Sequence, residues 1–356
     1  MRFAAALVLL VAACSQSPSV STATPGAASA PRVPGVYAVM VKDFLVQGGP
    51  NYTVSLVATD GHVAVGATGR KRTTRVQIGN LSTSKTTLYY LDGDSDVHYL
   101  RPDGATGFAT HIALGEHQVA VFAVSPDDRR IAVSVLDYTS FPVSTRLYVE
   151  DLSGGGNHIE LFSSTTVLEW PAGWHNGSLV MAIGKNVPPI IGFELFERGH
   201  GYHVADANTG VRLQSLCGGG DSYFPESPAG TVCNPGWGLV VFSWDGASRP
   251  VPKDGPCDRW GPLSPAGVMA SRSATVGGGC GWGAPIFLIA PNGTEDHSRQ
   301  LAPDSQPEGW IDNTHLVVSA DNPPNSSPRS VVDVSTGIVV PIQAPGFLGA
   351  VLPGGL

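Results

Sequence analysis

Short apolar runs alternate with turn residues along most of this chain. From residue 35 onward, runs of roughly four to seven residues rich in Val, Ile, Leu or Tyr are bounded by Gly, Pro, Asp, Asn or Ser, a pattern typical of β-strands. Clear examples are 36–41, 62–66, 86–91, 130–135, 145–151, 178–183, 239–244, 285–290, 315–320 and 330–334. No segment of about twelve residues here shows helical periodicity. The pattern therefore predicts an all-β fold.

The strand groups recur, which indicates a repeat architecture. Residues 171–180 (PAGWHNGSLV) resemble 307–317 (PEGWIDNTHLV) with one inserted residue, and Trp174 and Trp310 lie 136 positions apart (310 − 174). That distance equals about three repeats of ~45 residues. A Ser-Pro pair before an apolar strand appears at 125–126, 227–228 and 264–265. We predict a β-propeller with six blades, with seven as the alternative, and expect segment 36–57 to complete the last repeat and close the ring.

One repeat resembles a known propeller family. Residues 122–134 (FAVSPDDRRIAVS) are similar to the repeat of the TolB-like β-propellers, in which a Ser-Pro-Asp-Gly turn precedes a strand of small and apolar residues. Asp128 stands where that family usually has Gly, and 88–94 and 100–104 resemble other parts of such a blade. The resemblance covers two or three repeats in motif. It implies a fold and no particular activity, since such propellers serve both as binding platforms and as domains of hydrolases.

The first 34 residues are typical of a targeting segment followed by a tether. Residues 4–13 are apolar but too short to span a bilayer, and Val11-Ala12-Ala13-Cys14 resembles the bacterial lipobox. We expect residues 1–13 to be a signal peptide and Cys14 to carry a lipid that anchors the chain to the membrane. An ordinary signal peptide is the alternative. Residues 14–34 are small, polar and Pro-punctuated, as in flexible tethers, and 35–356 would form the extracytoplasmic propeller.

Four further cysteines, Cys217, Cys233, Cys257 and Cys280, fall within the predicted propeller. An exported chain with four cysteines favours disulfides. We prefer the pairs Cys217–Cys233 and Cys257–Cys280, because each closes a short loop. A zinc site is the alternative, but the chain has no C-x-x-C pair.

Charge limits the class of partner. The net charge is −8 and only 14% of residues are charged, which argues against nucleic acid as a partner. Arg70-Lys71-Arg72, with Arg75 nearby, is a local basic run. We expect a solvated strand edge there, with contact to anionic lipid or glycan as the alternative.

Two groups of polar residues could bind a metal. Asp92, Asp94 and Asp96 occupy alternate positions, a spacing that suits weak calcium binding, although such runs more often form a polar hairpin turn. Otherwise we expect no cofactor. The second group lies in 197–203, where Glu197, His200 and His203 come close together between glycines, and we expect an exposed loop there.

No G-x-S-x-G nucleophile motif occurs, and no catalytic residues can be named from the sequence. Trp237, Trp260 and Trp282 cluster with the cysteines and are our candidates for a binding face. The sequence thus predicts a non-catalytic, lipid-anchored scaffold at the cell envelope that binds a protein or a glycan. The alternative is an envelope hydrolase or lyase with an active site at the mouth of the central channel.

Overall fold

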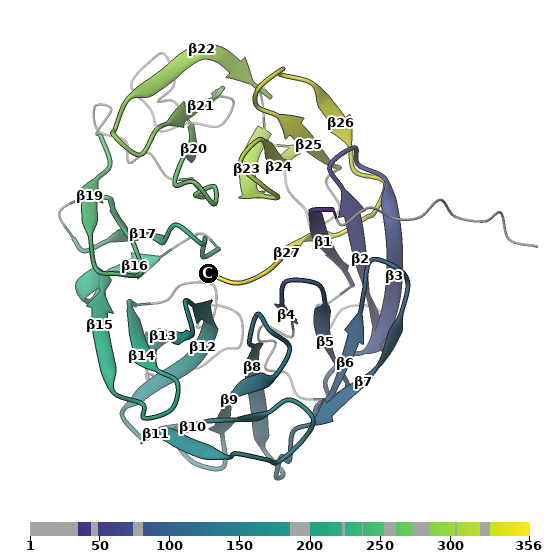
Figure 1. The fold of residues 1–356 in the computed structure, drawn as a ribbon, viewed down its shortest axis with the longest axis vertical. Coiled ribbons are helices and arrows are strands. Elements are labelled where there is room, and N and C mark those ends of the chain that lie inside the picture. Colours follow the sequence, from purple (N-terminus) through teal and green to yellow (C-terminus); the bar gives the residue numbers. More distant parts are fainter. Residues whose placement is uncertain are drawn as a thin grey trace, which may run out of the picture. The chain divides into compact units, whose positions relative to one another are not determined.

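The structure is a computed structural model, and it describes residues 35–43, 49–73, 81–185, 200–222, 225–236, 238–252, 261–272, 285–302, 305–320 and 328–356. Within these residues the strands form seven antiparallel sheets, six of four strands and one of three. The sheets are the blades of a β-propeller, arranged around a central axis (Figure 1). The all-β prediction is confirmed, and the blade number is the seven that the sequence analysis kept as its alternative.

The first four blades follow one another along the chain. From the axis outward, blade 1 contains β27 (Phe347–Leu352), β1 (Tyr37–Lys42), β2 (Asn51–Ala58) and β3 (Val63–Arg70). Blade 2 contains β4 (Leu81–Thr83), β5 (Leu88–Asp92), β6 (Asp96–Leu100) and β7 (Thr106–His111). Blade 3 contains β8 (Gln118–Val124), β9 (Arg130–Asp137), β10 (Ser144–Asp151) and β11 (Ile159–Ser164). Blade 4 contains β12 (Val167–His175), β13 (Ser178–Lys185), β14 (Tyr202–Asp206) and β15 (Arg212–Leu216).

The remaining blades complete the ring. Blade 5 contains β16 (Asp221–Ser222), β17 (Thr231–Asn234), β18 (Val240–Phe242) and β19 (Ser248–Pro250), and it follows a short 3₁₀ turn, η1 (Cys217–Gly219). Blade 6 contains β20 (Met269–Arg272), β21 (Ile286–Ile289) and β22 (Glu295–Leu301). Blade 7 contains β23 (Ser305–Trp310), β24 (His315–Ala320), β25 (Arg329–Asp333) and β26 (Val339–Pro341).

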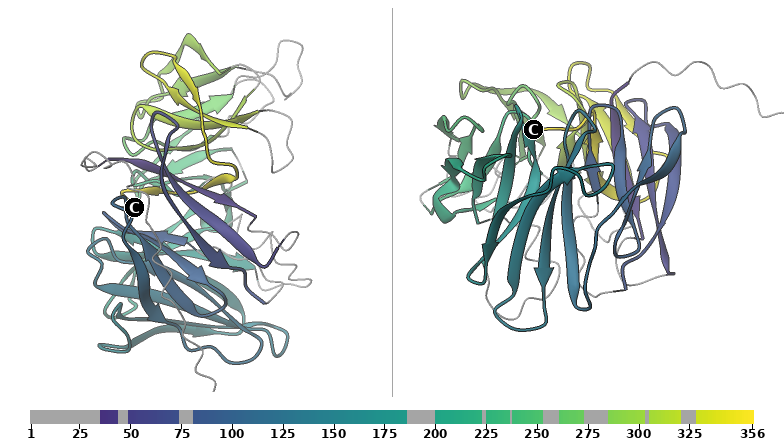
Figure 2. Two further views of the ribbon diagram at one scale, coloured as in Figure 1. Left: turned by 90° about the vertical axis from the view of Figure 1, so that its right-hand side faces the viewer. Right: turned by 60° about the horizontal axis from the view of Figure 1, so that its bottom comes forward.

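Blade 1 is built from both halves of the propeller chain. Its innermost strand, β27, pairs antiparallel with β1, with Tyr37 opposite Leu352 and Val41 opposite Phe347. Segment 36–57 therefore takes part in closing the ring as expected, but in blade 1 and not in the last repeat, because β23 to β26 form blade 7 by themselves. The turned views of Figure 2 show β27 passing beside the first strands.

The blade number was underestimated because blade 2 has a very short innermost strand. β4 spans only Leu81–Thr83, so the interval between residues 60 and 121 reads as one repeat in the sequence. In the structure that interval holds the outer strand of blade 1 and all of blade 2.

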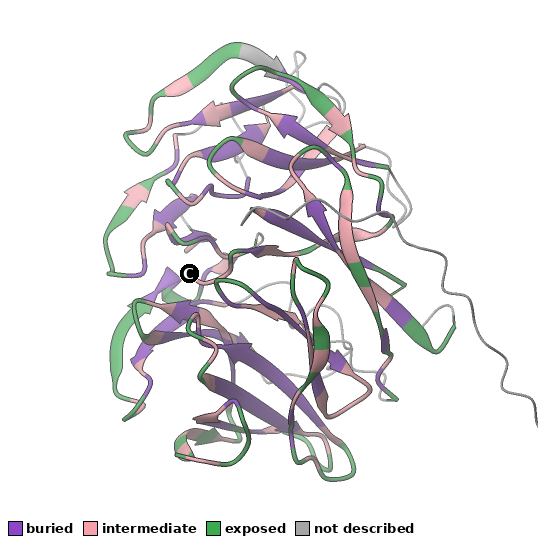
Figure 3. Cartoon of the chain, turned by 45° about the vertical axis from the view of Figure 1, so that its right-hand side comes forward, coloured by how far each residue is buried: buried purple, intermediate pink, exposed green. Residues whose placement is uncertain are grey.

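The outermost strands are the most exposed strands of their blades, and the buried residues gather on the strands inside them, as Figure 3 shows. In β8 every residue from Val119 to Val124 is buried, whereas in β15 the residues from Arg212 to Ser215 are exposed. Inner strands lie between neighbouring blades, so both of their faces are covered, and continuous apolar runs suit them better than alternation. The outer strands face solvent.

The recurring Ser-Pro pairs mark one structural position. Ser125-Pro126 and Ser227-Pro228 lie just before the second strands of blades 3 and 5, and Ser264-Pro265 lies just before β20 of blade 6. Ser125 stabilises its turn by accepting a hydrogen bond from the backbone N–H of Arg130 at 2.9 Å. Ser227 Oγ donates to the carbonyl of Ser264 at 2.9 Å, which joins the equivalent turns of blades 5 and 6.

Trp174 and Trp310 also occupy equivalent positions, at the ends of β12 and β23. Trp174 Nε1 donates to the carbonyl of Ala123 at 3.1 Å, and Trp310 Nε1 donates to the carbonyl of Pro262 at 3.0 Å. Each indole thus joins the innermost strand of its own blade to the innermost segment of the preceding one. Blades 4 and 7 are three blades apart, as the repeat spacing predicts.

Replacing Trp310 by Phe tests this link between blades. Phenylalanine keeps an aromatic side chain at this position but has no N–H. The buried carbonyl of Pro262 then loses its donor, which we expect to lower the free energy of unfolding by about 1–3 kcal/mol. Urea unfolding followed by fluorescence or circular dichroism measures the change. Val339→Ala, at an exposed position of the outer strand β26, is the control, and a Trp310→Phe protein as stable as that control would contradict the assignment.

Candidate functional site

A cavity of about 250 Å³ lies at the centre of the ring. Its walls come from the innermost strands β27, β4, β8 and β12 and from the segment that follows β16. The contributing residues include Leu81, Val121, Trp170, Trp174, Pro225, Pro228 and Ala350. Most of the described side chains that line it are apolar, and among them Glu226 has the one carboxylate side chain. The axial cavity, as we call it, therefore presents mainly apolar side chains, one acidic side chain and backbone groups.

Local structure places Glu226 at the cavity. It follows Pro225 and immediately precedes the Ser-Pro turn of blade 5, where the N–H of Ser227 donates to the carbonyl of Gly230 at 3.0 Å. Tyr202, from β14 of blade 4, donates its hydroxyl proton to Glu226 Oε1 at 2.9 Å. Tyr202 is only 2% exposed and packs edge-to-face against Trp244, with ring centroids 5.5 Å apart. Two blades thus hold the carboxyl group in a fixed position.

The surroundings of Glu226 change its chemistry. Burial raises the pKa of Glu226 above its ordinary value, and the hydrogen bond from Tyr202 offsets only part of that effect. Burial also raises the pKa of Tyr202 well above its ordinary value, so the phenol remains a proton donor. A carboxyl group in this state can pair with a cation, exchange hydrogen bonds with a hydroxyl group, or give up a proton.

The segment 353–356 lies against one side of the axial cavity, and the C-terminal end is seen at the centre of the ring in Figure 1. The N–H of Leu356 donates to the carbonyl of Trp174, and His175 Nδ1 lies 2.8 Å from the carbonyl oxygen of Leu356. The N–H of Gly354 donates to the carbonyl of Ser84. These contacts fasten the segment to blades 2 and 4.

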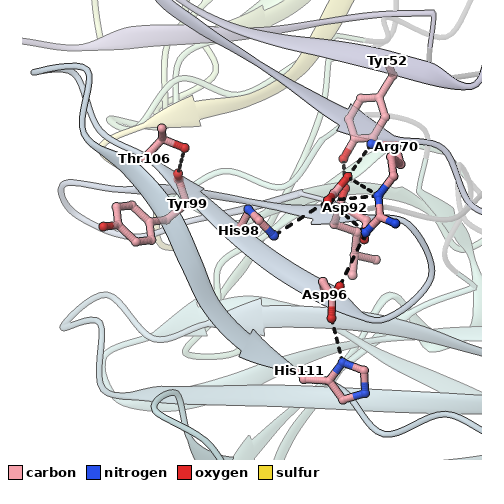
Figure 4. Close-up of polar contacts among 9 residues, drawn as sticks. Tyr52, Arg70, Asp92, Asp96, His98, Tyr99, Thr106 and His111 are labelled. Atoms are coloured by element: carbon pink, nitrogen blue, oxygen red, sulfur yellow. Dashed lines mark hydrogen bonds and ion pairs between the residues drawn. The ribbon is translucent and has the colours of Figure 1, made fainter. Parts of the chain in front are cut away.

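Two of the three aspartates proposed for calcium, Asp92 and Asp96, pair with the same Arg70 (Figure 4). Both carboxylate oxygens of Asp92 accept from Arg70 Nε at 3.1 Å, and Asp96 Oδ1 lies 2.7 Å from His111 Nδ1. Asp94 accepts from the hydroxyl of Thr73 at 2.7 Å. Within the described parts of the chain no group of three His, Cys, Asp or Glu is placed to hold a metal ion. Calcium binding at these aspartates stays a prediction, and the cation would compete with Arg70.

The basic run before this network is only partly solvated. Arg70 is largely exposed and pairs with Asp92; burial disfavours ionisation of Asp92, but the hydrogen bonds from Arg70 outweigh it and lower the pKa of that carboxyl. Arg72, in contrast, is 6% exposed and donates from Nη2 to the carbonyl of Ala120 on β8. The expectation of a solvated edge is wrong for Arg72, because the chain turns inward after β3 and brings this side chain against blade 3.

Only some of the cysteines and tryptophans that the sequence singled out lie among the described residues. Cys217 and Cys233 form a disulfide between η1 and β17, in agreement with the first preferred pair. Cys14, Cys257, Cys280, Trp237, Trp260 and Trp282 lie outside the described residues.

The histidine cluster expected on a loop is divided. His200 Nδ1 pairs with Asp221 at 2.5 Å, and Glu197 lies outside the described residues. His203 is not on an exposed loop: it is 8% exposed, in β14, and its Nδ1 lies 3.0 Å from Glu169 Oε1 on β12. The prediction failed there because the strand begins at Tyr202, directly after Gly201, and carries His203 into the sheet.

Sequence reasoning also missed Glu226 as a site residue. The one available signal was its position beside the recurring Ser-Pro turn, at the end of an innermost segment. Its partner Tyr202 is 24 residues away, in another blade, and no local pattern links the two.

Comparison with known proteins adds no family. No family model and no curated protein matches the chain. Among solved structures, the chain is similar to an oligogalacturonate lyase in complex with manganese (10% identity, 80% of this chain and 87% of that one, TM-score 0.48). It is also similar to apo AztD from Citrobacter koseri (12% identity, 88% and 84%, TM-score 0.44).

A third similar structure is the β-propeller domain of the Trilobed protease from Pyrococcus furiosus (11% identity, 86% of each chain, TM-score 0.42). Similarity at this level transfers no activity to this chain. No helix in the described part of the chain is long and apolar enough to cross a membrane.

Replacing Glu226 by Gln tests its raised pKa. The pKa of Glu226 is higher in the folded protein than in the unfolded chain. Well below its ordinary pKa, Glu226 is protonated in both states and does not lower the free energy of unfolding. As the pH rises through the folded pKa, the free energy of unfolding falls. Glutamine keeps the acceptor for Tyr202 but does not ionise. We expect Glu226→Gln to raise the Tm at about pH 8 and to leave it nearly unchanged at about pH 4.

Glu116→Gln, at a side chain that is 89% exposed, is the matched control and should show no such pH-dependent difference. Thermal unfolding at both pH values gives the change in Tm that each substitution causes. An equal effect of Glu226→Gln at the two pH values would show that Glu226 ionises normally.

Proposed function

We propose that this chain is a lipid-anchored scaffold of the cell envelope that binds a partner at its axial cavity. The observation that carries the proposal is the carboxyl group of Glu226, held by Tyr202 within an otherwise mainly apolar chamber at the centre of the ring. A few fixed polar groups in an apolar concavity are the usual composition of a binding site. The lipobox-like sequence ending at Cys14 and the tether after it support attachment to the membrane, and the TolB-like repeat supports an envelope protein.

The partner we favour is a protein that inserts a cationic side chain. Ionising Glu226 in its present surroundings is unfavourable, as the direction of its pKa shift shows. A lysine or arginine from the partner would offset that cost and would be oriented by the apolar walls. A glycan is the other partner class, and its hydroxyl groups would exchange hydrogen bonds with the same carboxyl group.

The two partner classes differ in their response to pH. Binding of a cation requires the ionised carboxylate, so it strengthens as the pH rises through the pKa of Glu226. Binding of hydroxyl groups depends much less on that ionisation, because both forms of the carboxyl group can form hydrogen bonds with them.

A second function, an envelope hydrolase or lyase, is favoured by the same raised pKa. A carboxyl group that keeps its proton to higher pH than usual can act as a general acid. In that case a glycan or lactone would be the substrate and Glu226 the proton donor.

Crosslinking in intact cells tests the binding function. We expect the wild-type protein and Glu116→Gln to capture the same partner, and Glu226→Gln to capture roughly tenfold less of it, since a charge-assisted hydrogen bond is lost. Equal recovery with both variants would exclude Glu226 as the contact. Turnover of a glycan or lactone panel that is abolished by Glu226→Gln would instead establish the enzyme.

The anchor is tested separately. In Cys14→Ser the acylated thiol is absent, so we expect the protein to leave the membrane pellet and to incorporate no labelled fatty acid. Ser19→Ala, in the tether, should behave like the wild type. Retention of Cys14→Ser in the membrane fraction would contradict lipid anchoring at this residue.

A further inference from the structure

A second cavity lies between blades 3 and 4, away from the axis. It has a volume of about 240 Å³ and is lined by apolar and charged side chains in separate groups. Leu161 and Phe162 of β11 and Met181 of β13 supply an apolar wall. Glu169 of β12, His203 of β14 and Arg212 of β15 supply the charged groups. We call this cavity the inter-blade pocket.

The inter-blade pocket is distinct from the axial cavity because successive residues of a strand point to opposite faces. Glu169 lines the inter-blade pocket, whereas its neighbour Trp170 lines the axial cavity. The backbone carbonyl of Glu169 also accepts a hydrogen bond from Ser134 Oγ of blade 3 at 2.6 Å, which fixes this part of β12 against that blade. The inter-blade pocket is therefore independent of the cavity on which the proposed function rests.

The three charged residues are arranged by depth. The side chain of Glu169 is 2% exposed, that of His203 is 10% exposed and that of Arg212 is 55% exposed. His203 Nδ1 lies 3.0 Å and Arg212 Nη2 lies 4.0 Å from the same carboxylate oxygen, Oε1. A buried carboxylate is costly unless cationic or donor groups face it, and these two side chains provide them. A ligand that enters the pocket meets the guanidinium group of Arg212 first.

Both basic side chains have nitrogen atoms without a hydrogen-bond partner among the described residues. His203 uses Nδ1 for Glu169, and among the described residues Nε2 has no hydrogen-bond partner. The guanidinium group of Arg212 likewise forms no hydrogen bond to a described residue, and its approach to Glu169 at 4.0 Å is only an ion pair. With His203 protonated, the formal charge of the trio is +1, because one carboxylate faces two cations.

We propose that the inter-blade pocket binds a small organic carboxylate whose apolar part packs against Leu161, Phe162 and Met181. The planar guanidinium group of Arg212 matches the two oxygens of a carboxylate, and protonated His203 adds a second donor. An amine would meet the positive charge of Arg212 at the entrance. The apolar wall selects a ligand with a ring or a short hydrocarbon chain over acetate or phosphate.

The test compares three probes of one shape: benzoate, benzyl alcohol and benzylamine. Calorimetric titration of the full protein should give at least tenfold higher affinity for benzoate than for the other two probes. Met181 lines the inter-blade pocket, so its NMR signal reports whether benzoate binds there. The chain has four methionines, so the ε-methyl NMR signal of Met181, assigned with Met181→Leu, should shift with benzoate.

Two variants separate the basic groups. Arg212→Gln should lower the affinity for benzoate about tenfold, whereas Arg129→Gln, at a side chain that is 82% exposed on a different turn, should leave it unchanged. His203→Asn keeps a donor for Glu169 but removes the second ring nitrogen, so the affinity for benzoate should also fall. Thermal unfolding checks that each variant is folded.

The proposal is overturned if benzoate binds no more tightly than benzyl alcohol. It is also overturned if Arg212→Gln and Arg129→Gln behave alike, or if the Met181 signal stays unchanged at saturation.

Discussion

Everything in this propeller depends on the antiparallel pairing of β27 with β1. The first and last blades of a ring must be held together, and here the strand before the C-terminal segment supplies the innermost strand of the blade that β1 begins. The same pairing brings segment 353–356 to the axis, where it contacts Ser84 and Trp174. The wall of the axial cavity is thus a direct consequence of how the ring closes.

Much of this fold could be predicted because the responsible signals are local. Strands, turns and the repeated Trp174 and Trp310 positions are encoded within a few residues each. The blade number was harder, because β4 has three residues and the repeat length varies around it. A strand that short carries almost no periodic signal, and it is defined by its pairing with β5.

The sites could not be predicted in the same way, because each combines residues from different strands or blades. Glu226 needs Tyr202, and Glu169 needs His203, which is 34 residues further along the chain. Which residues of two blades face each other depends on register and on bulges such as the one between Pro171 and Gly173. Aspartates close in sequence, by contrast, were expected to act together, and in the fold Asp92 and Asp96 share Arg70 while Asp94 accepts from Thr73.

Strand β12 connects the two cavities. Trp170 faces the axis and Glu169 faces blade 3, so one backbone segment forms part of both walls. Two hydrogen bonds fix it to blade 3, from Ser134 to the carbonyl of Glu169 and from Trp174 to the carbonyl of Ala123. Because this strand is fixed to blade 3 at both points, we expect filling of the inter-blade pocket to leave the shape of the axial cavity unchanged. The two cavities should therefore bind their ligands independently.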